Sequence, residues 1–247
     1  GVPHWYDMLI RLRFTRRRLP ALRYFTQAGG RLSEQAIHAL TEFADNNSSL
    51  FFRMYGQTEA TARMAWLDPA RAEKPDAIGQ AIPGGTLFLE DDDQNKIIQP
   101  GAVGELCFTG PNCMLGYVGS ASDLSGFDAY DVLRTGDLAY LDDDGDYHIA
   151  GRKKRIIKLL GERINLDGLE DLFASKALEV KCCGDDNGLI ICCFDADYPQ
   201  VQMLAREWVN CPPKFYNVNI VAEWPLLANS KTDYPRLAAI ARNASSE

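Results

Sequence analysis

Between residues 21 and 54 the sequence carries a strand pattern, a helix pattern and a second strand pattern, and this order constrains the fold more than any other feature. The first strand ends at the turn Ala28-Gly29-Gly30, and the second covers residues 49–54. Ser33 is suited to cap the N-terminus of the intervening helix, whose apolar residues recur at helical spacing. Strand–helix–strand order is the signature of an α/β sheet, so we assign residues 1–74 to an α/β portion.

After Pro75 the sequence changes to short strands that alternate with turn-rich acidic segments. Strand patterns are predicted at residues 86–90, 103–108 and 146–149. This alternation is typical of an antiparallel, barrel-like unit, which we expect over residues 75–151. The acidic runs 91–93 and 142–144 resemble metal ligands, but their position in hairpin turns favours solvated turn residues.

From Lys153 onward, strand and helix patterns alternate again. The predicted elements are a strand at 155–159, a helix at 166–178, a hairpin over 179–194, a helix at 199–209, a strand at 216–221 and a helix from 233. We expect residues 152–247 to form a small α+β domain that moves as a lid, joined to residues 1–151 near Gly151–Lys154. The predicted fold class is therefore α/β with a barrel-like subdomain, followed by this small domain.

Composition excludes several classes of protein. The formal net charge of −8 argues against a general nucleic-acid-binding protein, which needs a basic face. No apolar stretch is long enough to span a membrane. The adjacent pairs Cys182-Cys183 and Cys192-Cys193 lie on the two predicted strands of one hairpin, where neighbours point to opposite faces. They are therefore expected to be small buried residues and not one four-thiolate metal site, and reduced thiols of this kind favour a cytoplasmic location.

One segment departs from the acidic average. Arginines occupy positions 11, 13, 16, 17, 18 and 23. Such a stretch is typical of a solvated face, and it is also suited to dock a phosphate-bearing or acidic partner.

Three short motifs combine residue types suited to nucleotide chemistry. The first, Tyr55-Gly56-Gln57-Thr58-Glu59, follows a strand end, where α/β sheets bind ligands, and offers a ring to a base, a hydroxyl to phosphate and a carboxylate to Mg²⁺. The second, residues 134–138, places Asp137 in a turn where it could accept both ribose hydroxyls. The third, residues 151–164, carries cations suited to phosphates. Taken singly, they also fit an ordinary turn, an Asx turn and a basic strand.

In this order and spacing, the motifs resemble the adenylate-forming superfamily of acyl-CoA synthetases, peptide-synthetase adenylation domains and luciferases. Gly79–Gly84, Gly104-Glu105-Leu106, Gly116-Tyr117 and a segment like the family's lysine loop, Trp224–Lys231, extend the resemblance over nearly the whole chain. The resemblance implies that a carboxylic acid is activated with ATP to an acyl-adenylate. The acyl group then passes to a thiol of coenzyme A or of phosphopantetheine on a carrier protein.

The resemblance also implies roles for individual residues. The nucleotide-binding residues would be Tyr55 against adenine, with Gly29, Gly30, Gly56, Gln57, Asp137 and Arg152 around the nucleoside and phosphate. The catalytic residues would be Thr58 on phosphate, Glu59 on Mg²⁺ and Lys231 between the carboxylate and the α-phosphate. Lys154 would be the hinge, Lys158 and Gly161 would serve the thioester step, and Met54 and Ala62 would line the acyl pocket. Arg63 is suited either to pair with a second carboxylate of the acid or to lie at the surface.

Two departures from the family pattern matter. The Ser-, Thr- and Gly-rich phosphate loop ending in Lys has no counterpart in these residues, so we expect a fragment of a longer enzyme that is inactive alone. Ser230 replaces the glycine that usually precedes the catalytic lysine. The alternative hypotheses are a non-catalytic nucleotide- or partner-binding module of the same fold and a cysteine-hairpin metal protein.

Overall fold

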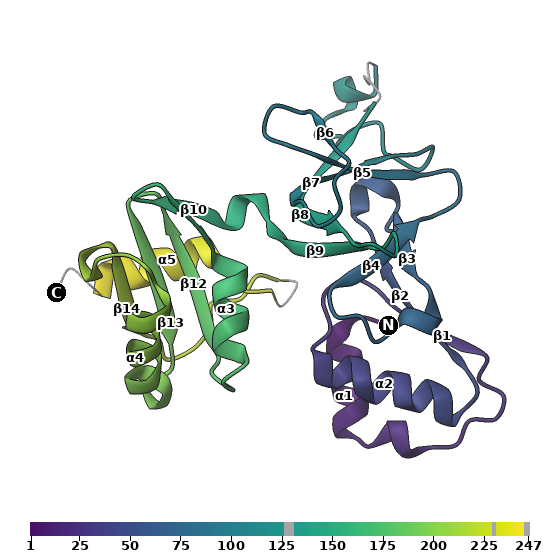
Figure 1. Ribbon diagram of the computed structural model, residues 1–247, viewed down its shortest axis with the longest axis horizontal. Helices are drawn as coiled ribbons and strands as arrows, with labels where there is room; N and C mark the ends of the chain where they lie inside the picture. The colour runs from purple at the N-terminus through teal and green to yellow at the C-terminus, as the bar shows by residue number, and fades with distance from the viewer. Residues whose placement is uncertain (126–130, 229–230, 245–247) are drawn as a thin grey trace. The chain divides into compact units, whose positions relative to one another are not determined.

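The structure is a computed structural model that describes residues 1–125, 131–228 and 231–244. The chain divides into two compact units, Gly1–Ala150 (unit 1) and Gly151–Glu247 (unit 2), coloured purple to teal and green to yellow in Figure 1. Among the described helices, none has the length and apolar character needed to cross a bilayer. The lid role assigned to residues 152–247 stays a prediction.

Unit 1 is built on one nine-stranded sheet within the described residues, in the order β1-β2-β3-β4-β9-β8-β7-β5-β6. The strands are β1 (Tyr24–Gln27), β2 (Leu50–Tyr55), β3 (Ala65–Leu67), β4 (Ala77–Ala81), β5 (Thr86–Glu90), β6 (Lys96–Ile97), β7 (Gly104–Thr109), β8 (Leu133–Leu141) and β9 (Tyr147–Arg152). β1 and β2 are parallel, while the pairs β2–β3, β3–β4, β4–β9, β7–β8, β5–β7 and β5–β6 are antiparallel. The sheet is therefore mixed.

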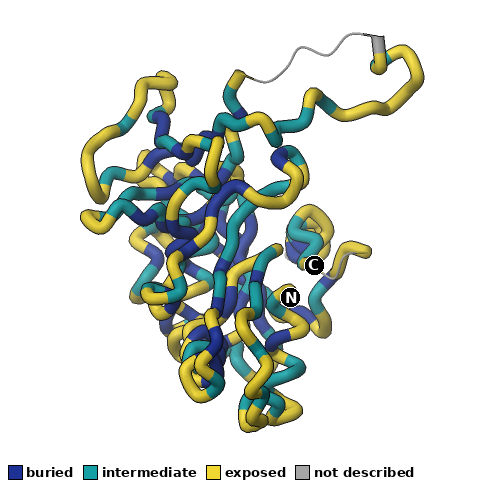
Figure 2. The backbone as a smooth tube through the Cα atoms, turned by 90° about the vertical axis from the view of Figure 1, so that its right-hand side faces the viewer, coloured by how far each residue is buried: buried dark blue, intermediate teal, exposed yellow. Residues whose placement is uncertain are grey.

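Two helices cover one face of β1 and β2. They are α1 (Pro3–Arg11) and α2 (Glu34–Asn46), and the Ser33 side chain caps α2 as predicted by accepting a hydrogen bond from the Ala36 amide at 3.2 Å. Alternate residues of β2 point toward the helices, so that Phe51 is 2% exposed and stacks on Phe25 with ring centroids 4.8 Å apart. In Figure 2 the buried residues follow the strands and the inner helix faces.

The strands predicted between residues 75 and 151 are present, but the expected barrel-like unit needs correction. β4 pairs with β3 on one side and with β9 on the other, so these strands continue the α/β sheet of residues 1–74. The strand order has two ends, β1 and β6, within the described residues. A second apolar core, which includes Leu89, Leu106 and Phe108, packs within this part of the sheet.

Unit 2 contains a two-stranded and a three-stranded sheet. Its elements are β10 (Ile156–Leu159), β11 (Glu162–Asn165), α3 (Leu166–Ala174), β12 (Val180–Asp185), β13 (Gly188–Cys193), α4 (Tyr198–Trp208), β14 (Tyr216–Ile220) and α5 (Tyr234–Ala244). β12 and β13 are the predicted antiparallel hairpin, and β14 joins β13 in parallel. Helices α3 and α4 pack on one face of this sheet, and α5 packs on the other.

The paired cysteines divide between the two faces of this sheet, as the period of two predicts. Cys182 and Cys193 belong to the core with α3 and α4, whereas Cys183 and Cys192 belong to the core with α5. All four are buried free thiols. Burial raises the pKa of Cys193 to about 11, which favours the protonated, unreactive form.

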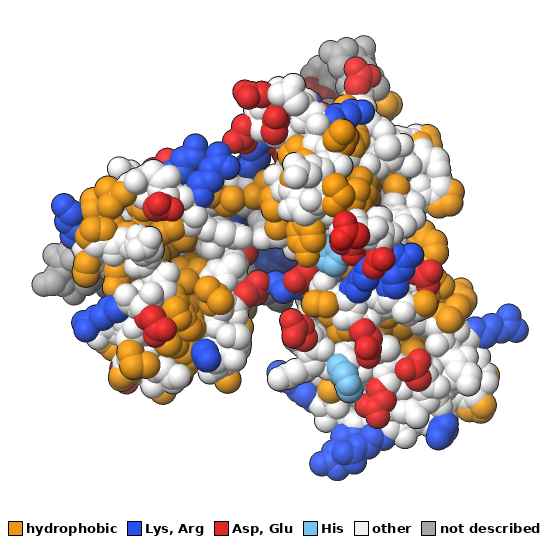
Figure 3. All heavy atoms as spheres, in the orientation of Figure 1, with side chains coloured by type: hydrophobic (Ala, Val, Ile, Leu, Met, Phe, Trp, Pro, Cys, Tyr) orange, Lys and Arg blue, Asp and Glu red, His pale blue; other side chains and the backbone are white. Residues whose placement is uncertain are grey.

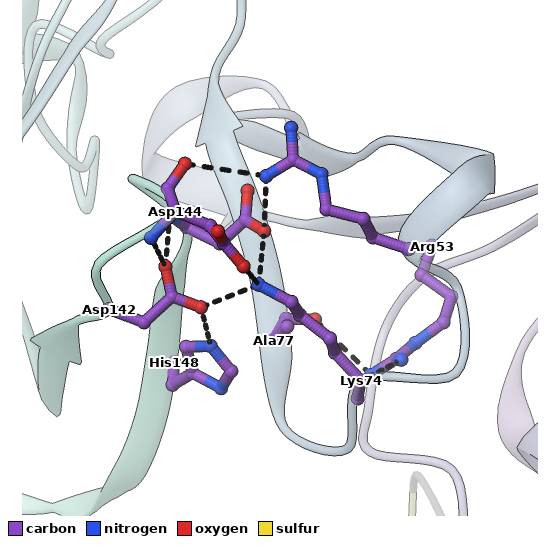
Figure 4. Close-up of polar contacts among 8 residues, drawn as sticks. Arg53, Lys74, Ala77, Asp142, Asp144 and His148 are labelled. Atoms are coloured by element: carbon purple, nitrogen blue, oxygen red, sulfur yellow. Dashed lines mark hydrogen bonds and ion pairs between the residues drawn. The ribbon is translucent and has the colours of Figure 1, made fainter.

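A cluster of charged residues ties the β8–β9 turn to the segment before β4. The Lys74 ammonium donates to Asp142 Oδ2 at 2.7 Å, Asp144 Oδ2 at 2.6 Å and Asp146 Oδ2 at 3.1 Å (Figure 4). His148 shares Oδ2 of Asp142 at 2.9 Å. The Asp142 side chain is only 21% exposed and is paired with Lys74, so the prediction of solvated residues at 142–144 is wrong for Asp142. It holds for Asp144, which is 66% exposed. The Asp146 side chain, just after that run, is 1% exposed.

Replacing Lys74 by methionine is expected to lower the melting temperature of unit 1, because it leaves the Asp142 and Asp146 carboxylates without this counter-ion. Burial alone would raise the pKa of Asp142, but the hydrogen bonds from Lys74 and His148 hold it below its usual value. A depressed carboxyl pKa stabilises the fold above the unfolded value of about 4 and loses that effect as pH falls through the folded pKa. The difference in melting temperature between wild type and variant should therefore be largest near neutral pH and smallest in acid.

The matched control is Lys176→Met, since Lys176 is an exposed residue of unit 2. Identical melting curves of the Lys74 variant and wild type at neutral pH would contradict a stabilising role for the cluster.

Candidate functional site

The predicted nucleotide-binding segments meet at one edge of the sheet in unit 1. β1 and β2 are parallel neighbours, with Gln27 opposite Arg53, so the segments that follow them leave the same edge. The first of these segments is the Gly29-Gly30 turn, held by a hydrogen bond from Gln27 Nε2 to the Gly30 carbonyl at 2.6 Å. Gly29 has φ of +85°, a left-handed conformation that favours glycine.

Tyr55 and Asp137 are joined directly although they are 82 residues apart. The Tyr55 hydroxyl donates to Asp137 Oδ2 at 2.5 Å, and Gln57 Nε2 donates to the same oxygen at 3.4 Å and to the Thr135 carbonyl at 2.9 Å. Burial, and next the Asp137 carboxylate, raise the pKa of Tyr55 far above its usual value, so its hydroxyl remains a donor. The structure therefore brings the first and second predicted motifs together around one carboxylate.

The second motif is held by its own strand. Thr135 Oγ1 donates to the Leu106 carbonyl at 2.7 Å and accepts from the Asp137 amide at 3.1 Å. Asp137 is only 4% exposed. Asp137 therefore lies within strand β8, where these contacts fix its position. The alternative for this motif, an Asx turn, does not describe it.

The chain after Gly56 folds back onto it. A Cβ atom at Gly56 would lie 2.7 Å from the Ala62 carbonyl carbon, which leaves no space for a side chain. This return passes through Thr61 and Ala62, both left-handed with φ of 51° and 63°. A left-handed β-branched residue is strained, and strain of this kind gathers at functional sites.

Glu59 lies on the short 3₁₀ turn Thr58–Ala60 that follows Gly56 and Gln57. The Tyr117 hydroxyl donates to Glu59 Oε1 at 2.5 Å, and this hydrogen bond lowers the pKa of Glu59, so the carboxylate form is favoured. The Met114 amide donates to the Glu59 carbonyl at 2.7 Å. Tyr117 was part of a matching motif but carried no predicted role, because nothing local in the sequence links it to a residue 58 positions away.

An apolar groove of about 480 Å³ lies on the β1–β3 face opposite the helices. Met54 lines it together with Phe52, Trp66 and other apolar side chains, and Arg63 is the only charged residue among them. Arg63 donates to the Met54 sulfur at 3.0 Å. Ala62, the second predicted acyl-pocket residue, is not among the residues that line the groove.

Four predicted residues lie at the start of unit 2. Arg152 ends β9, and Lys154 is exposed on the 3₁₀ turn Lys153–Arg155. Lys158 is exposed on β10, and its amide donates to Asp186 Oδ1 at 2.7 Å. Gly161 and Leu160 form the two-residue turn between β10 and β11, with φ of 88° and 53°.

Lys231 is an exposed residue of the same unit. Beside it, an antiparallel bridge joins Leu226 and Thr232, and the Leu227 amide donates to the Lys231 carbonyl at 2.8 Å. Asp233 directly precedes α5, and its carbonyl accepts a hydrogen bond from the amide of the fully buried Leu237. Ser230 lies outside the described residues.

A family model described as AMP-binding enzyme matches residues 1–118. The hybrid PKS-NRPS synthetase TAS1 of Cordyceps militaris is 32% identical over 236 residues, which are 88% of this chain and 15% of that protein. A long-chain-fatty-acid–CoA ligase of Salmonella typhimurium is 36% identical over 114 residues, which are 45% of this chain and 20% of the ligase.

Solved structures resemble nearly the whole chain. The amide bond synthetase McbA of Marinactinospora thermotolerans has a TM-score of 0.73 at 23% identity, over 97% of this chain and 51% of its own. O-succinylbenzoate coenzyme A synthetase of Bacillus subtilis, in complex with AMP, has a TM-score of 0.72 at 22% identity, over 96% and 50%. Identities this low bear on the fold alone. The chain spans about half of these structures and a smaller share of the curated relatives.

Proposed function

The chain belongs to the superfamily of AMP-binding, adenylate-forming enzymes, and from this membership we propose that the protein containing it activates a carboxylic acid with ATP. An oxygen of the acid forms a bond to the α-phosphorus while the bond from that phosphorus to pyrophosphate breaks. The acyl-adenylate then passes its acyl group to a thiol, with release of AMP. The observation that carries the proposal is the convergence of Tyr55, Gln57 and Asp137 at the end of β2.

The donor set around Asp137 fits a ribose. An ionised carboxylate only accepts hydrogen bonds, and the Tyr55 hydroxyl is such a donor at 2.5 Å. A ribose hydroxyl is a donor of the same kind. When a nucleoside binds, its ribose hydroxyl would replace the Tyr55 hydroxyl as the donor to Asp137, a carboxylate that is already removed from water. Because Asp137 is 4% exposed, this exchange requires Tyr55 to turn aside, which frees its ring to face a base.

The Thr58–Glu59 turn fits the phosphate end of the nucleotide. Mg²⁺ is usually held by one or two carboxylates together with substrate phosphates and water, and Glu59 supplies one carboxylate whose pKa is lowered. Bound there, the ion would offset phosphate charge. Thr58 is an exposed residue on the same turn, and we expect its hydroxyl to donate to a phosphate oxygen. Lys231 would stabilise the charge that builds on the α-phosphate during attack.

The groove of β1–β3 supports a place for the acyl group. It begins at Met54, next to Tyr55, and its lining is apolar except for Thr26 and Arg63. Such a surface suits an apolar or aromatic acid, and a guanidinium at its side suits an acid with a second anionic group. Residues 152–247, with Lys154, Lys158 and Gly161, are proposed to reorient for transfer to coenzyme A or to a carrier-protein pantetheine.

Replacing Asp137 by alanine is expected to weaken ATP binding by about 10- to 100-fold, since a hydrogen bond to a charged group contributes about 1.5–3 kcal/mol. Titration calorimetry with ATP on the protein that contains this chain measures the effect. Asp93→Ala is the control, because Asp93 is an exposed turn residue of the same unit. Equal ATP affinity of the Asp137 variant and wild type would remove Asp137 from the nucleotide site.

Acid-dependent pyrophosphate exchange tests the activity itself. A panel of aliphatic, aromatic and dicarboxylic acids should contain at least one that the intact protein adenylates. With Arg63→Leu, exchange with dicarboxylic acids is expected to fall by roughly tenfold or more relative to monocarboxylic acids, as a charge-assisted hydrogen bond is lost. If no acid supports exchange although ATP binds, the protein is a non-catalytic binding module of this fold.

A further inference from the structure

The arginine-rich segment of unit 1 forms a surface that the proposed function does not use. Six arginines occur between residues 11 and 23, and no acidic residue occurs between Asp7 and Glu34, although the chain has a net charge of −8. All six are exposed. Figure 3 shows cationic side chains along the end of unit 1 where Figure 1 draws α1, α2 and the loop after α1.

Contacts within the protein involve only some of these arginines. Arg18 donates to the Asn46 carbonyl at 2.5 Å and so satisfies an acceptor at the C-terminus of α2, where a cation is also favoured by the helix dipole. The Arg17 guanidinium lies 5.8 Å from the centre of the Phe14 ring. Within the described ranges, no ion pair joins any of the six to a carboxylate. Uncompensated cations of this density repel one another unless an anionic partner binds.

Large apolar side chains are exposed beside these cations. Trp5 is 57% exposed and Leu12 is 70% exposed. Residues seven apart lie on the same side of a helix, and Leu12 directly follows α1. Tyr6, by contrast, is buried against the core. The outer side of α1 therefore presents the Trp5 indole, and its C-terminal end presents Leu12, which lies between Arg11 and Arg13 in the sequence.

We propose that this surface, formed by Trp5, Leu12 and the arginines of residues 11–23, binds the anionic phospholipid face of a membrane. Arginine forks bind phosphate oxygens, and several cations near one surface add their attraction to anionic lipids. Tryptophan is favoured at the headgroup level, where its apolar ring and its N–H are both accommodated. A purely electrostatic partner such as nucleic acid or an acidic protein would use the arginines but leave the exposed Trp5 and Leu12 unexplained. The attachment is peripheral and independent of the adenylation proposed above.

Flotation of the chain with phosphatidylcholine vesicles, with and without phosphatidylserine, tests the proposal. Binding is expected only with phosphatidylserine and should weaken as salt rises. The triple variant Arg13→Glu, Arg16→Glu, Arg17→Glu should bind on the order of 100-fold more weakly, since each cation near the surface contributes roughly fivefold. The control Lys176→Glu, Arg206→Glu, Arg236→Glu makes the same change in net charge at exposed sites of unit 2 and should bind as wild type does.

A second readout does not depend on charge reversal. The tryptophan emission should shift to shorter wavelength on adding phosphatidylserine vesicles, and Trp5→Phe should remove most of that shift. The proposal is overturned if wild type ignores anionic vesicles, if both triple variants lose binding equally, or if the Trp5 variant keeps the full shift. It is also overturned if the arginine surface retains RNA or polyglutamate but no vesicle, which would assign it to another polyanion.

Discussion

Replacing Lys231 by alanine is expected to lower acid-dependent pyrophosphate exchange by about 100- to 1,000-fold in the protein that contains this chain. That is the usual cost of removing one preorganised group that stabilises charge in a transition state. Negative charge gathers on the α-phosphate as the carboxylate attacks, and a positioned ammonium is worth most at that step. The backbone beside Lys231 is tied by the Leu226–Thr232 bridge and by the hydrogen bond from the Leu227 amide to the Lys231 carbonyl, and α5 begins three residues later at Tyr234.

Two comparisons separate this role from a structural one. Transfer from a supplied acyl-adenylate to the thiol should be far less affected, because the adenylation step is bypassed. Lys176→Ala, an exposed lysine of the same unit, should leave both steps unchanged. Wild-type exchange in the Lys231 variant would remove this residue from the reaction.

The largest effect on stability is expected from Arg155→Leu in unit 2. The Arg155 guanidinium donates to Asp167 Oδ1 at 2.7 Å, Glu170 Oε1 at 2.5 Å and the Cys182 carbonyl at 2.7 Å, and lies 3.8 Å from the centre of the Tyr234 ring. Its side chain is 12% exposed and that of Glu170 is 13% exposed. Removing one partner of such a buried pair costs about 3–5 kcal/mol.

The loss should depend on pH in a defined direction. Burial raises the pKa of Glu170, and Arg155 opposes that rise. Without Arg155 the folded pKa moves further above the unfolded value, so Glu170 destabilises the variant most at neutral pH and least where it is protonated in both states. The variant should therefore regain stability as pH falls toward about 4.

Hydrogen exchange of α3 and β12 measures the stability of unit 2 separately from unit 1. Arg206→Leu is the control, because Arg206 is exposed on α4. Wild-type protection in the Arg155 variant would mean that packing, and not this network, holds the helices to the sheet.

The local pattern of apolar and polar residues was enough to predict most of the helices and strands. The Ser33 cap and the helical spacing after it predicted α2, and alternation predicted which cysteines share a face. The end of α3 was placed too late, at residue 178 and not Ala174. After the helix, Ala177 adopts a left-handed conformation with φ of 59°, and the Leu178 amide donates to the Phe173 carbonyl. Glycine usually occupies this left-handed position, so the helix end carried no such signal in the sequence here.

Non-local pairing could not be predicted from local pattern. The continuity of the sheet through β4 and β9 joins residues about 70 positions apart, and strand period alone does not state which strands pair. The same holds for Lys74 with Asp142 and for Tyr117 with Glu59. The two motifs assigned Tyr55 and Asp137 to the same nucleotide, but the direct hydrogen bond between them was not predicted. The roles assigned to all of the site residues, Tyr55 and Asp137 included, stay predictions.

The carboxylates of the turn between β8 and β9 face a cation from another part of the same unit, Lys74. These carboxylates sit around the Lys74 ammonium as the ligands of a calcium loop sit around a free ion, but this cation is covalently part of the chain. A tethered charge has a local concentration that dilution and chelation cannot lower. The negative charge of the β8–β9 turn is therefore offset by a charge that belongs to the fold itself, and the same contacts tie this turn to the segment before β4.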